Sequence, residues 1–406
     1  MDKKHIIIIS VYFPPIISVA SNRIFAFAKY LDSSKYKISV ITLLSSKSAT
    51  KIEIPNVDIH YIQNKQWIKR ATFAKKYPFL IHKFRAAWNI MLNKMGVNDS
   101  RSWEKQAFKT VEKCATNWIN TVIISSYPTE SPLAVASKIK QKHPELKWIA
   151  DLRDGISNNS NYSSDYFKNN HCKIEQNVLS QSDAITSVSK PIIDYLSQKN
   201  TRKNRIIKEI RNGFDFESGN NGLFNAVFTI SYVGTFYEKR NPNIFFKAIE
   251  IIIDQKLIPN FQINFVGVGG VLLVPSKLKK YISIIEKVPY SEAVELMRNS
   301  DALLLVLPVG ENKGVFSGKI FDYLGVMRPI IPLIDPDDVA AELIRETGAG
   351  KVAAWDSVDQ ALESILWTYH LWEKKTLPNY NRDQIQSYHR KNQVMKLSQI
   401  IEDLWN

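Results

Sequence analysis

The chain has 406 residues, a length that suits two folded domains of about 200 residues each. Apolar residues make up 45 % and charged residues 23 %, which excludes an intrinsically disordered or fibrous protein. The formal net charge of +15 predicts an anionic partner: phosphate groups, a lipid surface or nucleic acid.

The N-terminus carries Lys3 and Lys4 before the apolar run 6–9, a pattern that resembles a signal peptide. That run is short, leads into two prolines and has no small-residue cleavage site after it, so a buried parallel strand is favoured. No apolar run reaches the roughly 18 residues of a membrane-spanning helix. Cys114 and Cys172 fit neither a disulfide framework nor a zinc motif, which favours a reducing compartment.

Strand-length apolar runs alternate with amphipathic helical patterns along the whole chain. In the first half we predict strands at 6–11, 38–43, 121–125 and 147–150, and helices at 21–31, 101–118 and 131–142. In the second half, strands are predicted at 228–233, 262–266, 302–307 and 330–333. Such alternation predicts parallel βαβ units with helices on both faces of each sheet.

A polar stretch without periodicity, residues 217–222, separates the two sets and is typical of a linker. We therefore predict three parts: a Rossmann-like domain at 1–216, a second at 223–385, and a helical segment at 386–406. Because ligands of such sheets bind beyond the carboxyl ends of the strands, a cleft between two such edges is expected.

Charged and small residues follow several predicted strands of the first half. After the first strand, Ser21 is a candidate helix cap and Arg23 lies one turn inside that helix, near a possible anion site. A rigid connection with a surface arginine is the alternative. The fourth strand ends in Asp151, Arg153 and Asp154, which either face a cleft or form a structural ion pair.

Two clusters of the second half suit a nucleotide. Gly234 and Thr235 close a strand, and the adjacent cations Lys239 and Arg240 offer counter-charge for a diphosphate, although a solvated pair is also common. The stronger cluster is 314–324, where Ser317 is a candidate cap and Gly318 leaves room for a ligand. There Lys319 and Asp322 share a helical face, as a phosphate and ribose pair or as an ordinary ion pair.

Three further patterns are given little weight. The acidic run 335–338 resembles a metal motif of another fold, but it precedes a helix, where acids favour the N-terminus. The glycine-rich run 265–270 lacks the full dinucleotide fingerprint. The seven histidines show no paired metal spacing.

A basic aromatic segment runs from 59 to 98 without one acidic residue. Its apolar positions from Tyr77 to Met95 fall at helical spacing. Flanking cations and aromatics favour binding to an anionic membrane surface over packing against the first domain. No RNA-binding signature accompanies it, so nucleic acid is not expected. The predicted membrane-binding residues are Trp67, Lys69, Arg70, Lys75, Lys76, Lys83, Arg85 and Trp88.

The chain resembles family 4 glycosyltransferases, retaining enzymes of GT-B fold from bacterial polysaccharide and lipopolysaccharide assembly, along nearly its whole length. The motifs that carry the resemblance are Tyr12-Phe13-Pro14-Pro15, Ile149-Ala150-Asp151-Leu152-Arg153-Asp154, 184–189, 210–215, Tyr232-Val233-Gly234-Thr235-Phe236 and 317–324. The family's glycine pair after the first strand is replaced here by Ile17 and Ser18. Of its acidic pair, Asp322 takes the second place, and the first falls on Gly314.

The resemblance implies two Rossmann-like domains that face a central cleft, with a C-terminal helix crossing back to the first. It implies transfer of a sugar from a UDP- or GDP-linked donor to a lipid-linked or oligosaccharide acceptor. No metal or cofactor is expected. The expected location of the protein is the cytoplasm, at the inner face of the membrane. Catalytic roles fall to Asp151, Arg153, Asp154, Lys239 and Lys319; donor binding to Gly234, Thr235, Lys239, Arg240, Val288, Ser317, Gly318, Lys319 and Asp322; acceptor binding to Pro15, Ser18 and Arg23.

Two other functions fit parts of the sequence. A nucleotide-sugar epimerase shares this fold and donor site but needs neither an acceptor nor a membrane surface. A non-catalytic protein that binds an anionic lipid or polymer would use the basic segment alone.

Overall fold

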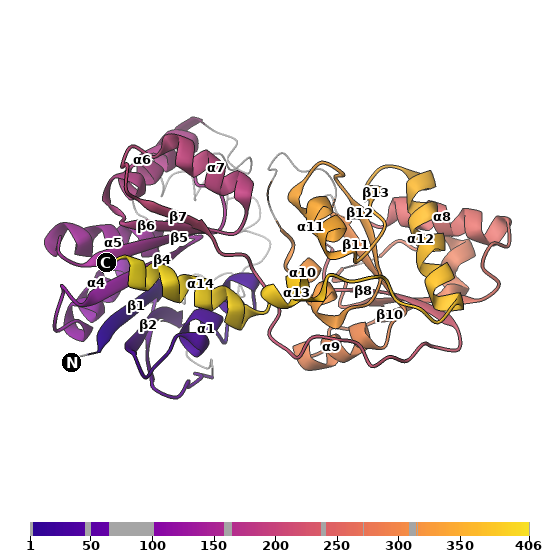
Figure 1. The fold of residues 1–406 in the computed structure, drawn as a ribbon, viewed down its shortest axis with the longest axis horizontal. Coiled ribbons are helices and arrows are strands. Elements are labelled where there is room, and N and C mark those ends of the chain that lie inside the picture. Colours follow the sequence, from indigo (N-terminus) through magenta and orange to yellow (C-terminus); the bar gives the residue numbers. More distant parts are fainter. Residues whose placement is uncertain are drawn as a thin grey trace, which may run out of the picture. The chain divides into compact units, whose positions relative to one another are not determined.

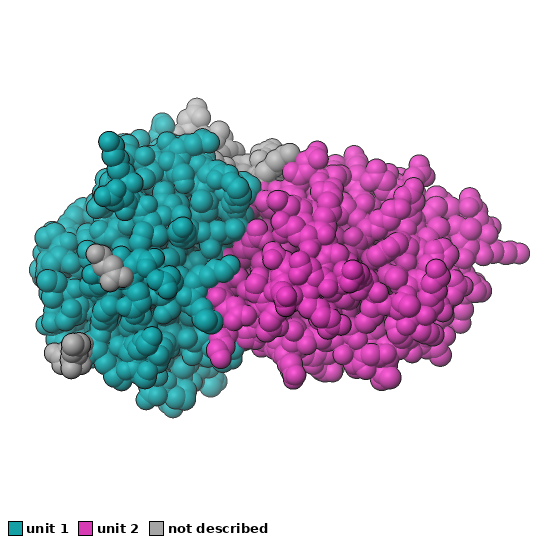
Figure 2. Space-filling model, viewed as in Figure 1, with its two compact units in different colours: residues 1–210, 394–406 teal, residues 211–393 magenta. Residues whose placement is uncertain are grey.

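The computed structural model describes residues 3–44, 50–64, 101–157, 165–236, 241–270, 272–307, 314 and 316–405, without the side chains of 165–168. The chain forms two compact units, residues 1–210 with 394–406, and residues 211–393 (Figure 2). The division lies a little before the predicted end of the first domain at 216, and the polar stretch 217–222 lies inside the second unit.

The first unit is built on a seven-stranded sheet with the order β3-β2-β1-β4-β5-β6-β7, and all its named strands pair in parallel (Figure 1). The strands are β1 (Lys4–Ser10), β2 (Tyr36–Leu44), β3 (Val57–Gln63), β4 (Thr121–Tyr127), β5 (Lys147–Leu152), β6 (Ala184–Ser187) and β7 (Ile206–Glu209). The helices are α1 (Val19–Tyr30), α4 (Arg101–Cys114), α5 (Glu130–Lys142), α6 (Asp165–Gln181) and α7 (Lys190–Lys199).

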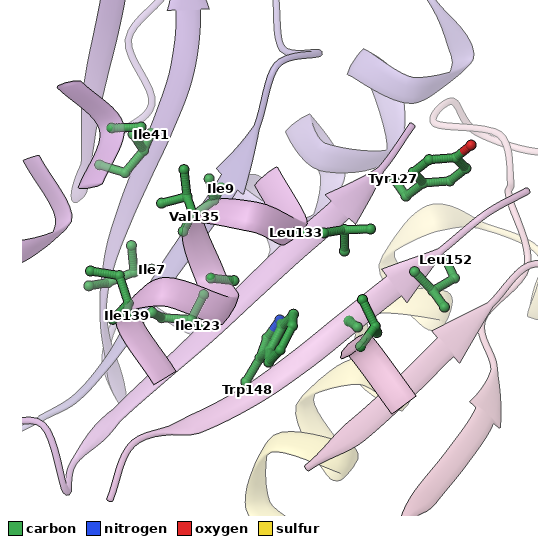
Figure 3. Packing of buried hydrophobic residues seen from close by; sticks show 14 of the residues in the cluster. Ile7, Ile9, Ile41, Ile123, Tyr127, Leu133, Val135, Ile139, Trp148 and Leu152 are labelled. Atoms are coloured by element: carbon green, nitrogen blue, oxygen red, sulfur yellow. The ribbon is translucent and has the colours of Figure 1, made fainter. Parts of the chain in front are cut away.

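Alternate residues of β1 point to opposite faces of this sheet, as the pleat requires. Ile7 and Ile9 pack with Leu133, Val135 and other residues of α4 to α7 (Figure 3). Ile6 and Ile8 pack with α1 on the other face. Because both faces are covered, the strand is a continuous apolar run, the property that made it resemble a signal peptide.

The C-terminal helix α14 (Arg390–Asp403) begins in the second unit, and from Val394 onward it belongs to the first (Figure 1). Leu397 and Ile401 join the apolar core on the α1 face of the first sheet. Glu402 forms an ion pair with Lys4 at 2.8 Å and accepts a hydrogen bond from the Tyr36 hydroxyl. These contacts tie the end of the chain to its first two strands.

The second unit has a six-stranded sheet of order β10-β9-β8-β11-β12-β13. Its strands are β8 (Phe228–Val233), β9 (Phe261–Val266), β10 (Ile282–Ile285), β11 (Ala302–Leu307), β12 (Ile330–Ile334) and β13 (Ala353–Ala354). Its helices are α8 (Asn243–Asp254), α9 (Tyr290–Arg298), α10 (Gly318–Val326), α11 (Val339–Thr347), α12 (Val358–Glu373) and α13 (Arg382–Ser387), with a 3-10 turn at Ser276–Tyr281.

This sheet is also covered on both faces. Leu303 and Leu305 of β11 pack with α9, α10, α11 and α13, whereas Leu304 packs with α8 and α12. Two α/β domains with parallel sheets confirm the predicted fold class. Among the described residues, no helix is both long enough and apolar enough to cross a membrane.

Candidate functional site

The candidate site of the second unit lies where the strand order reverses. Successive strands β8, β9 and β10 extend the sheet in one direction, and β11 pairs with the opposite side of β8. The loops that follow β8 and β11 therefore leave the sheet toward opposite faces. In sheets of this kind, ligands bind at the carboxyl ends of the strands on either side of such a reversal.

Gly234 follows β8 and Lys319 lies in the first turn of α10, after β11, and the two meet at this edge. The Lys319 ammonium group donates to the Thr235 carbonyl at 3.3 Å and lies 5.3 Å from the centre of the Tyr232 ring. A Cβ atom on Gly234 would lie 2.4 Å from Lys319 Cε, and the φ of Gly234 is +118°. The backbone conformation therefore favours glycine here, and any larger residue would displace the end of the Lys319 side chain.

The glycine-rich run after β9 packs against the same loop. The Phe236 amide donates to the Val268 carbonyl at 3.0 Å, and the Thr235 hydroxyl donates to the Gly267 carbonyl at 3.1 Å. A Cβ atom on Gly269 would lie 2.9 Å from Thr235 Cγ2. This run, which sequence reasoning set aside, thus supports the loop beside Lys319.

The start of α10 differs from the prediction in one respect. Ser317 is the N-cap residue, but its side chain makes no capping hydrogen bond. The backbone amides of the first turn keep the electropositive character of a helix N-terminus, which favours an anion. Nearby, the Gly314 amide donates to Asp338 Oδ1 at 2.8 Å, and Asp338 also caps α11, so the acidic run 335–338 has a structural task.

Asp322 lies one turn further along α10 than Lys319. The Tyr290 hydroxyl, at the start of α9, donates to Asp322 Oδ1 at 2.7 Å. Burial raises the pKa of the Asp322 carboxyl to about 6, although the charge of Arg390, the Tyr290 hydrogen bond and the charge of Lys319 act in the opposite direction. Tyr290 carries no motif, and sequence reasoning missed it.

Tyr323 is a second residue that sequence reasoning missed. Its side chain is fully buried, and its hydroxyl accepts a hydrogen bond from the Val233 amide at 3.0 Å. This bond attaches α10 to the last residue of β8 and so maintains the spacing between Lys319 and Gly234. Val288 is half-buried in the loop before α9, two residues from Tyr290.

The raised pKa of Asp322 makes folding stability depend on pH. The folded state binds the Asp322 proton more tightly than the unfolded chain does. The stability that protonated Asp322 contributes is therefore complete below about pH 4 and is lost as pH rises through about 6. Asp322→Asn should therefore stabilise the second unit by about 2 kcal/mol at pH 7.5, less than the full shift implies because water reaches part of the carboxyl.

Chemical denaturation at pH 4 and pH 7.5 measures this difference. Asp356→Asn, at an exposed turn, is the control for loss of a carboxylate. A stability gain of equal size at both pH values would contradict the raised pKa.

In the first unit, the predicted residues at the carboxyl edge form a closed network. Asp151 is fully buried, and Arg23 donates to its two carboxylate oxygens at 2.7 and 3.0 Å. Ser126 and Thr186 also donate to it, at 2.9 and 2.8 Å. Burial opposes ionisation of Asp151, but the charge and hydrogen bonds of Arg23 outweigh it and keep the pKa below its usual value.

Arg23 is buried rather than exposed at the helix surface. Besides Asp151, it donates to the Ile210 carbonyl at 2.8 Å. The cap of α1 also differs from the prediction, because Ser18 is the N-cap and accepts from the Ser21 amide. Pro15 is half-buried in the loop that leads to this cap.

Arg153 and Asp154 follow β5 at the same edge. Arg153 donates from Nε to the Tyr127 carbonyl at 3.2 Å, and its Nη2 lies 3.7 Å from Asp154 Oδ2. Burial lowers the pKa of the Arg153 guanidinium and raises the pKa of the Asp154 carboxyl. The structure thus brings Asp151, Arg153 and Asp154 to one edge of the first sheet, and Gly234, Thr235, Lys319 and Asp322 to one edge of the second.

Several predicted residues lie outside the described part of the chain. They are Lys239, Arg240, Trp67, Lys69, Arg70, Lys75, Lys76, Lys83, Arg85 and Trp88. Their roles stay predictions.

No family model matches the sequence, and no curated protein matches it. Solved structures do. An α,α-trehalose-phosphate synthase (UDP-forming) from Burkholderia xenovorans matches with a TM-score of 0.61 and 10 % identity over 99 % of this chain and 100 % of that one. The lipopolysaccharide outer core galactosyltransferase WaaB matches with a TM-score of 0.59 and 11 % identity, over 98 % of this chain and 99 % of that one.

A putative UDP-N-acetylglucosamine 2-epimerase from Listeria monocytogenes matches with a TM-score of 0.54 and 11 % identity, over 100 % of this chain and 97 % of that one. The match to S. aureus TarM, with a TM-score of 0.51 and 11 % identity, covers 74 % of this chain but only 58 % of that one. At these identities the similarity shows the fold, which is GT-B.

Proposed function

We propose that this chain is a glycosyltransferase that moves a sugar from a nucleoside-diphosphate sugar to a saccharide acceptor. The observation that carries the proposal is the position of Lys319, a cation held against a strand-end glycine and beside a helix N-terminus at the strand-order reversal. This arrangement suits a diphosphate. Several similar structures name UDP in their descriptions, among them a trehalose-phosphate synthase, TarM and a putative epimerase.

In this proposal the donor diphosphate lies against Lys319 and the amides of the first turn of α10. As the glycosidic bond breaks, negative charge grows on the leaving diphosphate, and a fixed cation stabilises that charge. Asp322, held by Tyr290, accepts hydrogen bonds from the ribose hydroxyls. We infer that Lys239 and Arg240 add further counter-charge, that no metal is needed, and that the anomeric carbon keeps its configuration.

The first unit supplies the acceptor side. Asp151, Arg153 and Asp154, with Pro15, Ser18 and Arg23, lie at or near the carboxyl edge of its sheet. We propose a lipid-linked or oligosaccharide acceptor in the assembly of a bacterial surface polysaccharide, at the cytoplasmic face of the membrane.

An epimerase is the second candidate, because a putative epimerase has the same fold. To separate the functions, we would incubate the protein with a panel of UDP- and GDP-sugars, with and without a polyprenyl-diphosphate-linked acceptor. A transferase releases nucleoside diphosphate only when the acceptor is present. An epimerase produces a new nucleotide sugar without it. Binding of acidic lipid with no conversion of any donor would overturn both.

Replacing Gly234, which lies against Lys319, should weaken donor binding. In Gly234→Ala, the new Cβ displaces Lys319 Cε, and we expect about ten-fold weaker binding of UDP by calorimetry, together with a backbone cost of about 1–3 kcal/mol. Gly219→Ala is the matched control: its φ is +132°, but nothing lies within 4 Å of the added Cβ. Equal UDP affinity in both variants would show that Lys319 does not hold the donor.

The basic segment gives a separate test of membrane binding. Changing Lys75, Lys76, Lys83 and Arg85 to glutamate should release the protein from anionic liposomes, because each basic residue near such a surface contributes about 1 kcal/mol. A control variant changes four exposed lysines elsewhere, Lys203, Lys279, Lys280 and Lys374. If the wild-type protein does not sediment with anionic liposomes at low salt, the membrane proposal is wrong.

A further inference from the structure

Arg153 is a buried arginine with few hydrogen bonds to the described part of the protein. The residue is only 9 % exposed, yet the Tyr127 carbonyl is the one hydrogen-bond acceptor that the described structure provides for it, at Nε. Asp154 lies 3.7 Å from Nη2, within ion-pair range but beyond hydrogen-bond distance. A guanidinium group has five N–H donors, so most of its donors have no protein acceptor among the described residues.

The nearby carboxylate of Asp151 does not fill this gap. Its oxygens already accept two hydrogen bonds from Arg23 and one each from Ser126 and Thr186, which occupies the acceptor capacity of a carboxylate. The charges of Arg23 and Asp151 balance each other. Of the two arginines described at this edge, Arg153 is thus the one whose charge is less compensated.

Partial burial of a charged group is costly, and the Arg153 Nη atoms are not among the side-chain atoms that are sealed from solvent without a partner, so a ligand can reach them. Eleven per cent of the Arg153 side chain is exposed, which leaves a path to it from outside. The residue follows β5, at the carboxyl edge of the sheet, where ligands of such sheets bind. Guanidinium matches the geometry of phosphate and carboxylate oxygens.

We propose that Arg153 binds an oxyanion, a phosphate or a carboxylate, carried by the acceptor substrate. The proposal rests on the glycosyltransferase function and makes it more specific: the acceptor is acidic near the reacting group. The Nη groups donate to the oxyanion, and the low exposure of Arg153 strengthens these bonds.

Asp154 competes with such a ligand. Its carboxylate lies on the Arg153 side of the loop, and 36 % of its side chain is exposed, so it can turn toward water when the oxyanion enters. Removing its charge should therefore strengthen binding. Arg153→Gln and Asp154→Asn then have effects of opposite sign, which a general loss of folding does not produce.

The test uses the full chain and three hexoses that differ in one group: glucose 6-phosphate, glucuronate and glucose. We expect calorimetry to detect binding of at least one charged sugar and much weaker binding of glucose. Arg153→Gln should lower the affinity for the charged sugar about ten- to a hundred-fold, and Asp154→Asn should raise that affinity several-fold. Vesicles of phosphatidylcholine with and without a polyprenyl phosphate show whether a lipid supplies the oxyanion.

Arg205 provides a matched control. It is also 9 % exposed and lies in the same unit, but its Nε bonds the Ser182 carbonyl ahead of β6, at the other edge of the sheet. Its unpartnered Nη2 is shielded from solvent. Arg205→Gln should therefore keep wild-type affinity for the charged sugar. Equal loss in Arg153→Gln and Arg205→Gln, or no preference of the wild-type protein for charged sugars, overturns the proposal.

Binding of UDP separates this inference from the proposed function. Arg153→Gln should bind UDP like the wild-type protein, since Gly234 and Lys319 are unchanged. If UDP does not bind at all, the donor site is wrong. If UDP binds but glucose 6-phosphate, glucuronate and the polyprenyl phosphate vesicles do not, the donor site stands and the acidic acceptor is wrong.

Discussion

Replacing Lys319 with alanine is expected to lower turnover by about a hundred-fold or more, the effect typical of losing one electrostatic contact to a developing charge. The leaving diphosphate is more negative in the transition state than in the bound donor. Lys319 therefore stabilises the transition state more than the ground state. Its loss should lower turnover much more than it lowers donor affinity. Steady-state kinetics with donor and acceptor, together with calorimetry of UDP binding, measure the two effects.

Lys247→Ala, on an exposed position of α8, is the control for loss of a lysine in the same unit. Asp322→Asn should act differently, because it loses a charged acceptor for hydroxyls and so weakens donor binding. If Lys319→Ala turns over and binds UDP like the wild-type protein, the donor site lies elsewhere.

Asp151→Ala is expected to destabilise the first unit by about 3–5 kcal/mol, because it leaves the buried charge of Arg23 without its partner. For a unit of this size, each kcal/mol lowers the melting temperature by about 2–4 °C, so we expect a decrease of about 10 °C. Differential scanning calorimetry measures the change, with the transition of the second unit as an internal reference.

The double variant Arg23→Met, Asp151→Leu removes both charges together and should recover most of the lost stability. This comparison also tests the catalytic role predicted for Asp151. An Asp151→Ala protein that melts like the wild type but has lost turnover would show that Asp151 acts in the chemistry. A protein that melts early would show that its main task is to maintain the edge of the sheet.

The fold was predictable because its signals are local. The run from Ile6 to Ile9 is apolar without interruption, as expected of a strand covered on both faces, and β8 and β11 begin and end at the predicted residues. The strands β3, β6, β7, β10 and β13 were not predicted: β10 (Ile282–Ile285), for example, has exposed positions, and β13 has two residues. Their pairing depends on neighbouring strands rather than on their own composition.

The candidate site was predictable only in part. Strand-end position and charge singled out Lys319, Asp322 and Arg153. Ser317 and Ser21 were expected to cap helices, but neither side chain does so: the cap of α1 lies three residues earlier, at Ser18, and Ser317 is an N-cap residue whose side chain makes no capping bond. Tyr290 was missed because its hydroxyl reaches Asp322 across 32 residues of sequence.

By itself, the sequence determined the two alternating sets of strands and helices, the glycine and lysine that follow β8 and β11, and the acidic and basic residues after β5. Periodicity and strand ends are properties of neighbouring residues, so they can be read along the chain. Only the tertiary structure decided which of these residues meet. Strand order placed Lys319 against Gly234 and joined Arg23 to Asp151 across 128 positions. It also left Arg153, at the same edge as Asp151, with a single hydrogen bond to the described residues.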